Sequence, residues 1–455
     1  MSKQLKISAF FKPTEDSKQG RGSKQIKITQ FFKRPGDMDK DGSPGKSIGV
    51  RKFQPEDFVE DYSDQKRKVP TANGGEKTVR NCPFYKHIPG TKFVMDAFSF
   101  GEIKGVERYF LSHFHSDHYM GLRKSFSGSL VCSTITGKLV ISQFNVDPTR
   151  IIMLDLHQPK IIDGVKVVLV DANHCPGAAI FLFILPDGRR ILHTGDFRAC
   201  PEMEKDRYLI EKPIDQIFLD TTYCDPNYCF PDQKETLQTI LNIALDRLKK
   251  DPLTLFACGT YSIGKEKVFK CLCENLNFSV WVSAYKLKFL KCIDDEVINR
   301  HLTDQQDSAQ VHVLPMRDIN PKFLGDYLRG CNRRFTSIVA FKPTGWTEKG
   351  GRLDEIKPTS YGKIHIYGIP YSEHSSFNEL ERFIKFFKPK TITPTVNVGN
   401  PNTRGKMFKI LNSWKSSYAQ SRIIPKKEEP PVVSIDDFID DGVDDELAII
   451  PIEHV

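Results

Sequence analysis

The chain has 455 residues, of which 39% are hydrophobic and 27% charged, and this length predicts two or three folded units. No apolar run approaches the roughly 20 residues that span a bilayer, and no signal-peptide core is present at the start. Eleven scattered cysteines without a CxxC pair argue against a disulfide framework. The net charge of +9 divides unevenly: residues 1–52 carry 13 basic and 5 acidic side chains (+8), residues 426–455 carry 2 and 10 (−8), and the part between them carries +9. A basic middle part suits a protein that binds a polyanion.

The N-terminal part, residues 1–80, is expected to be disordered and contains a repeat. Residues 3–13 (KQLKISAFFKP) and 24–34 (KQIKITQFFKR) are identical at seven of eleven positions, and the Gly-, Ser- and Lys-rich sequence between them cannot bury a core. On one helical turn, the Ile and the two Phe of each copy share an apolar face suited to a partner's groove. The pattern resembles the peptide box that binds the sliding clamp PCNA. This resemblance implies a clamp contact through Gln4, Ile7, Phe10, Phe11, Gln25, Ile28, Phe31 and Phe32.

A short basic cluster at residues 65–70 lies on a stretch that we also expect to be disordered. It fits a nuclear import signal and, equally, a solvated run of charge. Folded structure is expected from about Asn81 onward.

The densest group of ligand-type residues follows a predicted strand at 108–111. His113 and His115 are two residues apart, so on an extended segment their side chains point the same way. Asp117 and His118 follow where the chain is expected to turn into a helix. Four such residues within six positions are a strong signal in a chain with 12 histidines. Imidazole and carboxylate groups together predict a site for Zn²⁺ or for a mixed pair of divalent ions.

Four further candidate residues have similar surroundings, because each lies in the polar loop that follows a predicted strand. They are Asp96 after 93–95, His174 after the hairpin at 161–170, Asp196 after the hairpin at 179–193, and Asp220 after 214–219. Asp96 either orients a metal ligand from behind or is a turn aspartate. His174 is a third imidazole ligand or a structural histidine, and Asp196 could bridge two ions.

Beyond Asp220, strands alternate with helices and predict a small α/β unit over residues 231–362. Asp232 is expected to cap a helix, and a glycine turn at 259–264 leads into a helix from Lys265. The backbone N–H groups of this turn are expected to form an anion site, although the turn is not a Walker loop. The predicted strands lie at 253–257, 280–282, 311–314 and 337–341.

The last folded part is expected to return with a strand at 364–367. Ser376 and Glu379 predict a capping box for a helix, and 390–398 is the last predicted strand. The acidic tail, 426–455, is expected to be disordered. Its residues 447–452 resemble a SUMO-interacting strand.

These motifs together resemble a known fold family. Asp96, the motif HxHxDH, His174 and Asp196 match in order and context the metal motifs of the metallo-β-lactamase fold. The motifs LDTTYCDP, FACGTYSIGKEK and PYSEHSS resemble those of its β-CASP branch, and within it those of the DNA cross-link repair nucleases, kin of Artemis and Apollo. The resemblance covers about residues 81–415. It implies an α/β fold, an αββα sandwich made of residues 81–230 and 363–425, with a β-CASP cap inserted at 231–362.

The resemblance also implies roles for the candidate residues. It assigns the first metal to His113, His115 and His174, the second to Asp117 and His118, and a bridging position to Asp196. Zn²⁺ is expected at the first site, and Zn²⁺, Mg²⁺ or Mn²⁺ at the second. His374 is then the general acid for the leaving oxygen, Asp220 orients it, and Asp96 supports the ligands from behind.

One position bears on the substrate. RNA-processing members of the branch carry a further histidine about 22 residues beyond the equivalent of His374, where this chain has Val396, which favours DNA. The family's exonucleases favour a 5′-phosphate. The residues that could bind this phosphate, or could be ordinary loop and surface residues, are Tyr371, Ser372, Ser375, Lys265 and Lys342.

The sequence thus predicts a nuclear, monomeric, metal-dependent 5′-to-3′ DNA exonuclease that acts in interstrand cross-link repair at replication forks. Its expected partners are DNA with 5′-phosphate ends and PCNA. The alternatives are a β-CASP RNA endonuclease, a β-lactamase-like hydrolase of small molecules, and a catalytically inactive scaffold that binds the clamp.

Overall fold

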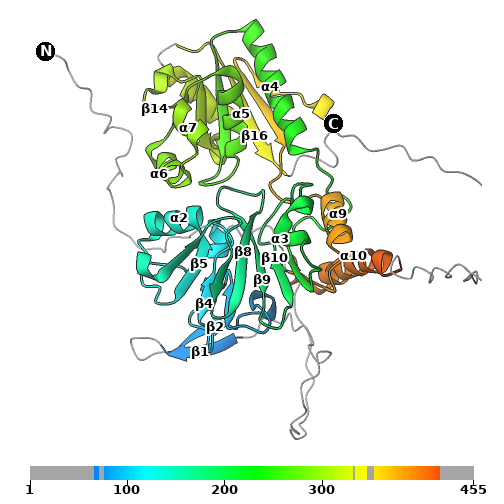
Figure 1. Ribbon diagram of the computed structural model, residues 1–455. Coiled ribbons are helices and arrows are strands. Elements are labelled where there is room, and N and C mark those ends of the chain that lie inside the picture. Colours follow the sequence, from blue (N-terminus) through cyan, green and yellow to red (C-terminus); the bar gives the residue numbers. More distant parts are fainter. Residues whose placement is uncertain (1–65, 71–75, 332–333, 346–352, 421–455) are drawn as a thin grey trace, which may run out of the picture. The chain divides into compact units, whose positions relative to one another are not determined.

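The computed structural model describes residues 66–70, 76–331, 334–345 and 353–420 (Figure 1). The predicted clamp-binding boxes, the acidic tail and residues 447–452 lie outside the described residues. Within the described part of the chain, no helix is both long and apolar enough to cross a membrane.

Two sheets form the first layered unit. The first sheet has four parallel strands in chain order: β3 (Phe93–Met95), β4 (Arg108–Phe110), β5 (Ser129–Ser133) and β6 (Ile151–Leu154). The second has six strands in the order β19-β11-β10-β9-β8-β7. They are β7 (Lys160–Ile162), β8 (Val165–Asp171), β9 (Ala179–Ile184), β10 (Arg190–His193), β11 (Gln216–Leu219) and β19 (Thr391–Pro394). Strands β7 to β10 pair antiparallel, whereas β10, β11 and β19 pair parallel.

The two sheets pack face to face, because successive side chains of each strand point to opposite faces of its sheet. In β9, Phe181 and Phe183 belong to the same hydrophobic cluster as Phe110 of β4, whereas Ile180 and Leu182 belong to the cluster on the other face. The ring centroids of Phe110 and Phe183 lie 5.1 Å apart. Aromatic residues from both sheets therefore form a layer between them, as in a sandwich.

Helices cover the outer faces of the sandwich. The helices of this unit are α1 (Ser116–Tyr119), α2 (Thr134–Phe144), α3 (Arg207–Ile210), α9 (Phe377–Phe387) and α10 (Pro401–Gln420). Ser376 and Glu379 form the predicted capping box at the start of α9. The buried side of α9 packs on the six-stranded sheet, and the ring centroids of Phe383 and Phe197 lie 5.0 Å apart. The predicted αββα sandwich is confirmed.

The second layered unit is a seven-stranded sheet with helices on both faces (Figure 1, green to yellow). Its order is β14-β13-β15-β12-β16-β18-β17, parallel except for β17. The strands are β12 (Thr254–Thr260), β13 (Val280–Val282), β14 (Leu302–Thr303), β15 (Val311–Pro315), β16 (Ser337–Thr344), β17 (Thr359–Tyr361) and β18 (Ile364–Pro370). The helices are α4 (Gln233–Lys250), α5 (Glu266–Leu276), α6 (Ala284–Ile293), α7 (Glu296–His301) and α8 (Pro321–Gly330). This unit is the predicted cap, and Asp232 caps α4 as expected.

The described residues also form seven short 3-10 helices. They are Phe84–Lys86, Phe98–Phe100, Pro148–Arg150, Met203–Lys205, Gln306–Ser308, Met316–Asp318 and Leu353–Glu355.

One predicted strand joins the other sheet, and two predicted strands are present but differ at their ends. The strand at 364–367, expected to return to the sandwich, is part of β18 and pairs with β16, so it belongs to the cap sheet. The strand expected at 253–257 is β12, which continues to Thr260 and includes Gly259 of the expected turn. The last strand, β19, ends at Pro394 rather than at Val398, and the N–H group of Val396 bonds to the side chain of Thr221 instead of to a backbone carbonyl group.

The region before Asn81 also differs from the prediction. The basic cluster lies on β1 (Lys66–Pro70), which pairs antiparallel with β2 (Glu76–Arg80), rather than on a disordered stretch. The sequence between these strands contains Asn73-Gly74-Gly75, a composition that favours hairpin connections.

Candidate metal centre

The loop after β4 brings the first two histidines together with residues from two other strand ends. His113 Nε2 lies 2.9 Å from His115 Nδ1, and the same Nδ1 atom lies 3.1 Å from His174 Nε2. Asp196 Oδ2 lies 3.7 Å from His113 Nε2 and 4.0 Å from His174 Nε2. Three imidazole nitrogens and one carboxylate oxygen therefore converge on one point.

A second cluster shares Asp196 with the first. Helix α1 presents Asp117 and His118, and His118 Nε2 lies 3.6 Å from Asp117 Oδ2 and 3.2 Å from Asp196 Oδ2. Asp117 is exposed, whereas Asp196 is buried. The carboxylate of Asp196 thus lies between two groups of ligand atoms, as a bridging residue must.

These two clusters fit a divalent ion. The ligand atoms within each cluster lie within 4.8 Å of one another, and three imidazoles with one carboxylate are a donor set that Zn²⁺ favours. Burial holds the pKa of His113 and of His174 well below the usual value, so both rings are neutral, as ligation requires.

A positive charge is held at the second cluster by His118. Burial acts against the charged ring, but the carboxylates of Asp196 and Asp96 outweigh it and raise the pKa of His118 well above the usual value. Burial likewise acts to raise the pKa of Asp196, but His118 outweighs it and holds this pKa well below the usual value. The clustered carboxylates therefore require a cation at this position, which a bound divalent ion would supply.

Each histidine of the two clusters is oriented through the ring nitrogen that does not face the other ligand atoms. His118 Nδ1 lies 2.7 Å from Asp96 Oδ2, and His113 Nδ1 lies 2.9 Å from Ser112 Oγ. His115 and His174 make the corresponding contacts with backbone carbonyl groups. With the ring proton on these nitrogens, the nitrogens that face the cluster can bind a metal, and at His118 the metal would take the place of the second ring proton.

Asp96 occupies the orienting position that we predicted. Its backbone lies in the left-handed region, with φ at +51°, and its Oδ1 and Oδ2 atoms accept hydrogen bonds from Ser112 N and Ser112 Oγ, both at 2.8 Å. Ser112 therefore links Asp96 to the ligand His113. Ser112 was not among the predicted site residues, because a single serine beside a histidine motif carries no distinctive signal.

Replacing Asp96 tests this arrangement. We expect Asp96→Asn to lower the metal affinity about 10- to 100-fold, because the amide holds His118 less firmly than the carboxylate does. The measurement is a competition titration with a chromogenic chelator. Asp163→Asn is the control, since Asp163 pairs with Arg108 at a partly exposed position away from the centre. An unchanged affinity in Asp96→Asn would contradict the orienting role.

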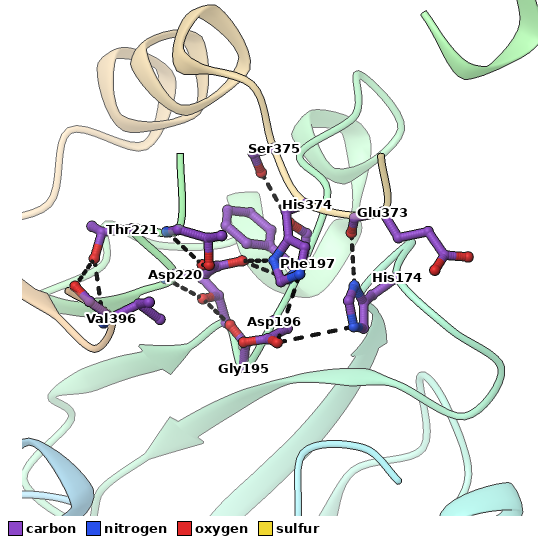
Figure 2. A network of polar contacts seen from close by, with 12 residues as sticks. His174, Gly195, Asp196, Phe197, Asp220, Thr221, Glu373, His374, Ser375 and Val396 are labelled. Carbon is purple, nitrogen blue, oxygen red and sulfur yellow. Dashed lines mark hydrogen bonds and ion pairs between the residues drawn. The ribbon is translucent and has the colours of Figure 1, made fainter. Parts of the chain in front are cut away.

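His374 and Asp220 form a pair at the edge of the centre (Figure 2). His374 Nδ1 lies 2.8 Å from Asp220 Oδ2, and His374 Nε2 lies 3.9 Å from Asp196 Oδ2. Thr222 N and Thr222 Oγ1 both donate to Asp220 Oδ1. Burial opposes the charged ring, but Asp220 and Asp196 raise the pKa of His374 to about 9. The His374 side chain is 24% exposed, so Nε2 can meet a ligand while Nδ1 stays on Asp220.

The residues proposed for a phosphate pocket lie in different environments. Ser372 Oγ donates to His374 O, and Ser375 Oγ donates to Phe197 O, so both hydroxyl protons are used by the backbone. Tyr371 is buried in the cap core, and its hydroxyl has no hydrogen-bond partner among the described residues. Lys342 is exposed on β16, whereas Lys265 is buried.

The predicted anion site before α5 is already filled by carboxylates of the chain itself. Both oxygens of Glu266 accept from Gly264 N, and Glu373 Oε1 accepts from Lys265 N at 2.7 Å. The ammonium of Lys265 lies 3.5 Å from Glu373 Oε2. The prediction was wrong because it counted the N–H groups of the turn without the acidic side chains that reach them.

Val396, the residue that the resemblance associates with the choice between RNA and DNA, lies beside the segment that carries Asp220. It follows β19, and its carbonyl accepts from Thr221 Oγ1 at 2.7 Å, one residue from Asp220 (Figure 2). Its side chain offers no ligand atom, so the second cluster consists of Asp117, His118 and Asp196 alone among the described residues.

Comparisons with known proteins agree with this fold. Residues 97–248 match the family model "Beta-lactamase superfamily domain", and residues 296–400 match "DNA repair metallo-beta-lactamase". The chain is 49% identical over 350 residues to DNA cross-link repair 1A protein of Gallus gallus, which covers 76% of this chain and 36% of that protein. It is 35% identical over 314 residues to 5' exonuclease Apollo of Gallus gallus, and this match covers 68% of this chain and 63% of that protein.

The chain spans little more than a third of the length of the chicken cross-link repair 1A protein. The DNA cross-link repair protein SNM1 of Arabidopsis thaliana, in contrast, is matched over most of its length: it is 42% identical over 369 residues, which are 78% of this chain and 76% of that protein. The chain therefore belongs to the SNM1 family of DNA cross-link repair proteins, which combine a metallo-β-lactamase fold with a β-CASP cap.

Proposed function

We propose that this protein is a metal-dependent nuclease that hydrolyses DNA phosphodiester bonds in the 5′-to-3′ direction, prefers a 5′-phosphate end and acts in interstrand cross-link repair. The observation that carries the proposal is the position of Asp196, which joins the three ligand clusters: the three-histidine cluster, the Asp117–His118 cluster and the Asp220–His374 pair. Such a centre has what phosphodiester hydrolysis needs, namely metal ligands and an adjacent proton donor.

Bound divalent ions, with Zn²⁺ proposed at the three-histidine cluster, would supply an activated water and a Lewis acid for a phosphoryl oxygen. The chain itself supplies the orientation of the ligands. Asp96 and Ser112 hold His118 and His113, while two backbone carbonyl groups hold His115 and His174.

His374 is proposed to donate the proton that the leaving oxygen needs. Its Nδ1–H group is held by Asp220, and its Nε2 atom lies on the side of Asp196 and the ligand clusters. A proton on Nε2 is thus held within reach of a phosphodiester at the centre. After Nε2 has transferred its proton, the neutral ring is still bonded to Asp220. Water then reprotonates Nε2, and the pair returns to its starting state.

The preference for DNA rests on Val396. A side chain without a ligand atom at this position leaves the second cluster with three residues, a pattern that the sequence resemblance associates with DNA-directed members of the branch. The names of the relatives, DNA cross-link repair 1A protein and 5' exonuclease Apollo, support the same substrate class and direction.

The location and partners are proposed on sequence motifs. The two boxes in residues 3–34 support binding to PCNA, and residues 447–452 support binding to SUMO. Two boxes in one chain would add avidity on a ring of identical subunits. A clamp-bound DNA repair enzyme would act in the nucleus, at replication forks.

The direct test is a digest of single-stranded DNA labelled at its 3′ end, with and without a 5′-phosphate, beside an RNA strand of the same sequence. We expect a ladder that shortens from the 5′ end, depends on the phosphate, and disappears with a chelator and in Asp196→Asn. Cleavage of RNA alone would contradict the interpretation of Val396. An absence of cleavage of both strands by metal-loaded protein would contradict the nuclease function.

A further inference from the structure

Two of the metal-site histidines are oriented by backbone carbonyl groups from different parts of the chain. His174 Nδ1 lies 2.7 Å from the carbonyl oxygen of Glu373, which is in the loop after β18 (Figure 2). His115 Nε2 lies 3.2 Å from the carbonyl oxygen of Ile263, which is in the loop between β12 and α5 of the cap. We call this second segment, residues 261–265, the junction loop.

Glu373 also holds the junction loop through its side chain. Its Oε1 atom accepts from the backbone N–H of Lys265 at 2.7 Å, and its Oε2 atom lies 3.5 Å from Lys265 Nζ. The side chains of Glu373 and Lys265 are 6% and 8% exposed, so the contact is shielded from water. In a buried position, a charge-assisted hydrogen bond to a backbone N–H is strong and directional.

The backbone of the junction loop is strained where Glu373 holds it. Lys265 has φ at +70°, which is unfavourable for a residue with a Cβ atom. Such a conformation persists where neighbouring contacts fix it, and here the hydrogen bond to Glu373 is made by the N–H group of that same residue.

The junction loop, the carboxylate and His115 are in direct contact. Gly264 has φ at +103°, and a Cβ atom there would lie 2.9 Å from Glu373 Oε2 and 3.6 Å from His115 Nε2. A Cβ atom at this position would therefore displace the Glu373 carboxylate. A displacement of the loop would therefore be transmitted to the imidazole of His115.

We infer that Glu373 is a positioning residue that couples the cap to the metal centre: its carboxylate fixes the junction loop, and the loop's Ile263 carbonyl fixes the ring of His115. Removing the carboxylate releases His115, whereas the contact of His174 with the main chain of residue 373 remains. The inference concerns the metal centre on which the proposed function depends. It is tested without DNA, so its failure and the failure of the nuclease proposal can be told apart.

The test measures metal affinity and ligand geometry in the full chain. We expect Glu373→Ala to weaken metal binding about 10- to 100-fold in a chelator competition, because one of the imidazole ligands loses its orientation. The same variant loaded with Co²⁺ should show weaker and shifted visible absorption bands, which report the geometry of the ligands. Glu373→Gln should restore most of the affinity and the wild-type bands, because its amide oxygen can still accept from Lys265 N–H.

Two variants separate this effect from loss of folding. Glu373→Ala leaves the buried Lys265 ammonium bonded to the Tyr371 carbonyl oxygen but without a carboxylate. The double variant K265M/E373A removes both charges and should show the same weak binding with a folded circular dichroism spectrum. Asp295→Asn is the matched control, since it weakens an ion pair with Lys270 elsewhere in the cap and should leave affinity and Co²⁺ bands unchanged.

Two results would overturn the inference. One is wild-type affinity and wild-type Co²⁺ bands in both Glu373→Ala and K265M/E373A. The other is an equal loss in Asp295→Asn, which would assign the effect to the stability of the cap rather than to the contact of Glu373 with the junction loop.

Discussion

Asp196→Asn should reduce DNA hydrolysis at least ~1000-fold, because several kcal/mol of transition-state stabilisation depend on the metal charge that this carboxylate holds in place. Asp196 is the residue common to all three ligand clusters, and its Oδ2 atom lies within 4.0 Å of four histidines, His113, His118, His174 and His374. No other described residue of the centre belongs to all three clusters. The loss should be accompanied by a lower metal content per chain, measured by mass spectrometry of the bound metal.

Asp206→Asn is the matched control for this variant. Asp206 is also a nearly buried aspartate that contacts a histidine, with its Oδ2 atom 3.0 Å from His157 Nδ1, but it belongs to the start of α3 and not to the centre. We expect wild-type metal content and activity from it. Activity within tenfold of wild type in Asp196→Asn would contradict a bridging role for this residue.

Much of the centre could be predicted from the sequence because its ligands follow strand ends in a distinctive pattern. The HxHxDH motif, His174 and Asp196 converge as expected, and the capping box of Ser376 and Glu379 forms as expected. In each case the signal is local: the spacing of a few residues decides which way the side chains point.

The contacts that orient the ligands could not be predicted in the same way. Every residue type has a backbone carbonyl group, so no side-chain pattern marks those of Ile263 and Glu373 as contacts of the histidines. Glu373 also reaches Lys265 from 108 residues away in the chain. One of the two carboxylates that fill the turn before α5 therefore comes from a distant segment, whereas the other, Glu266, is a neighbour in the sequence that bonds back to Gly264 N.

The strand at Ile364–Pro370 was misassigned for a related reason. A buried strand has the same apolar pattern whichever sheet it joins, and its partner is decided by tertiary packing against β16. Similarly, periodicity alone did not show that β19 ends at Pro394, because the N–H group of Val396 beyond it bonds to the side chain of Thr221, from a distant segment.

His374→Ala should lower the rate of DNA hydrolysis about 100- to 10,000-fold, because the leaving oxygen then departs without a proton from a positioned acid. Asp220→Asn should cause a smaller loss, since the ring remains but its Nδ1–H group loses the carboxylate at 2.8 Å. Both losses are measured as single-turnover rates on the same 5′-phosphorylated strand.

A change of leaving group distinguishes a proton donor from a metal ligand. In a strand whose scissile linkage carries sulfur in place of the leaving 3′ oxygen, the thiolate departs without a proton. The defect of His374→Ala should then shrink to within about tenfold of wild type, because general acid catalysis no longer contributes. The defect of Asp196→Asn should persist, because it arises from the loss of metal charge and not of the acid. An equal defect of His374→Ala on the oxygen and sulfur strands would mean that His374 acts on the metal centre rather than on the leaving group.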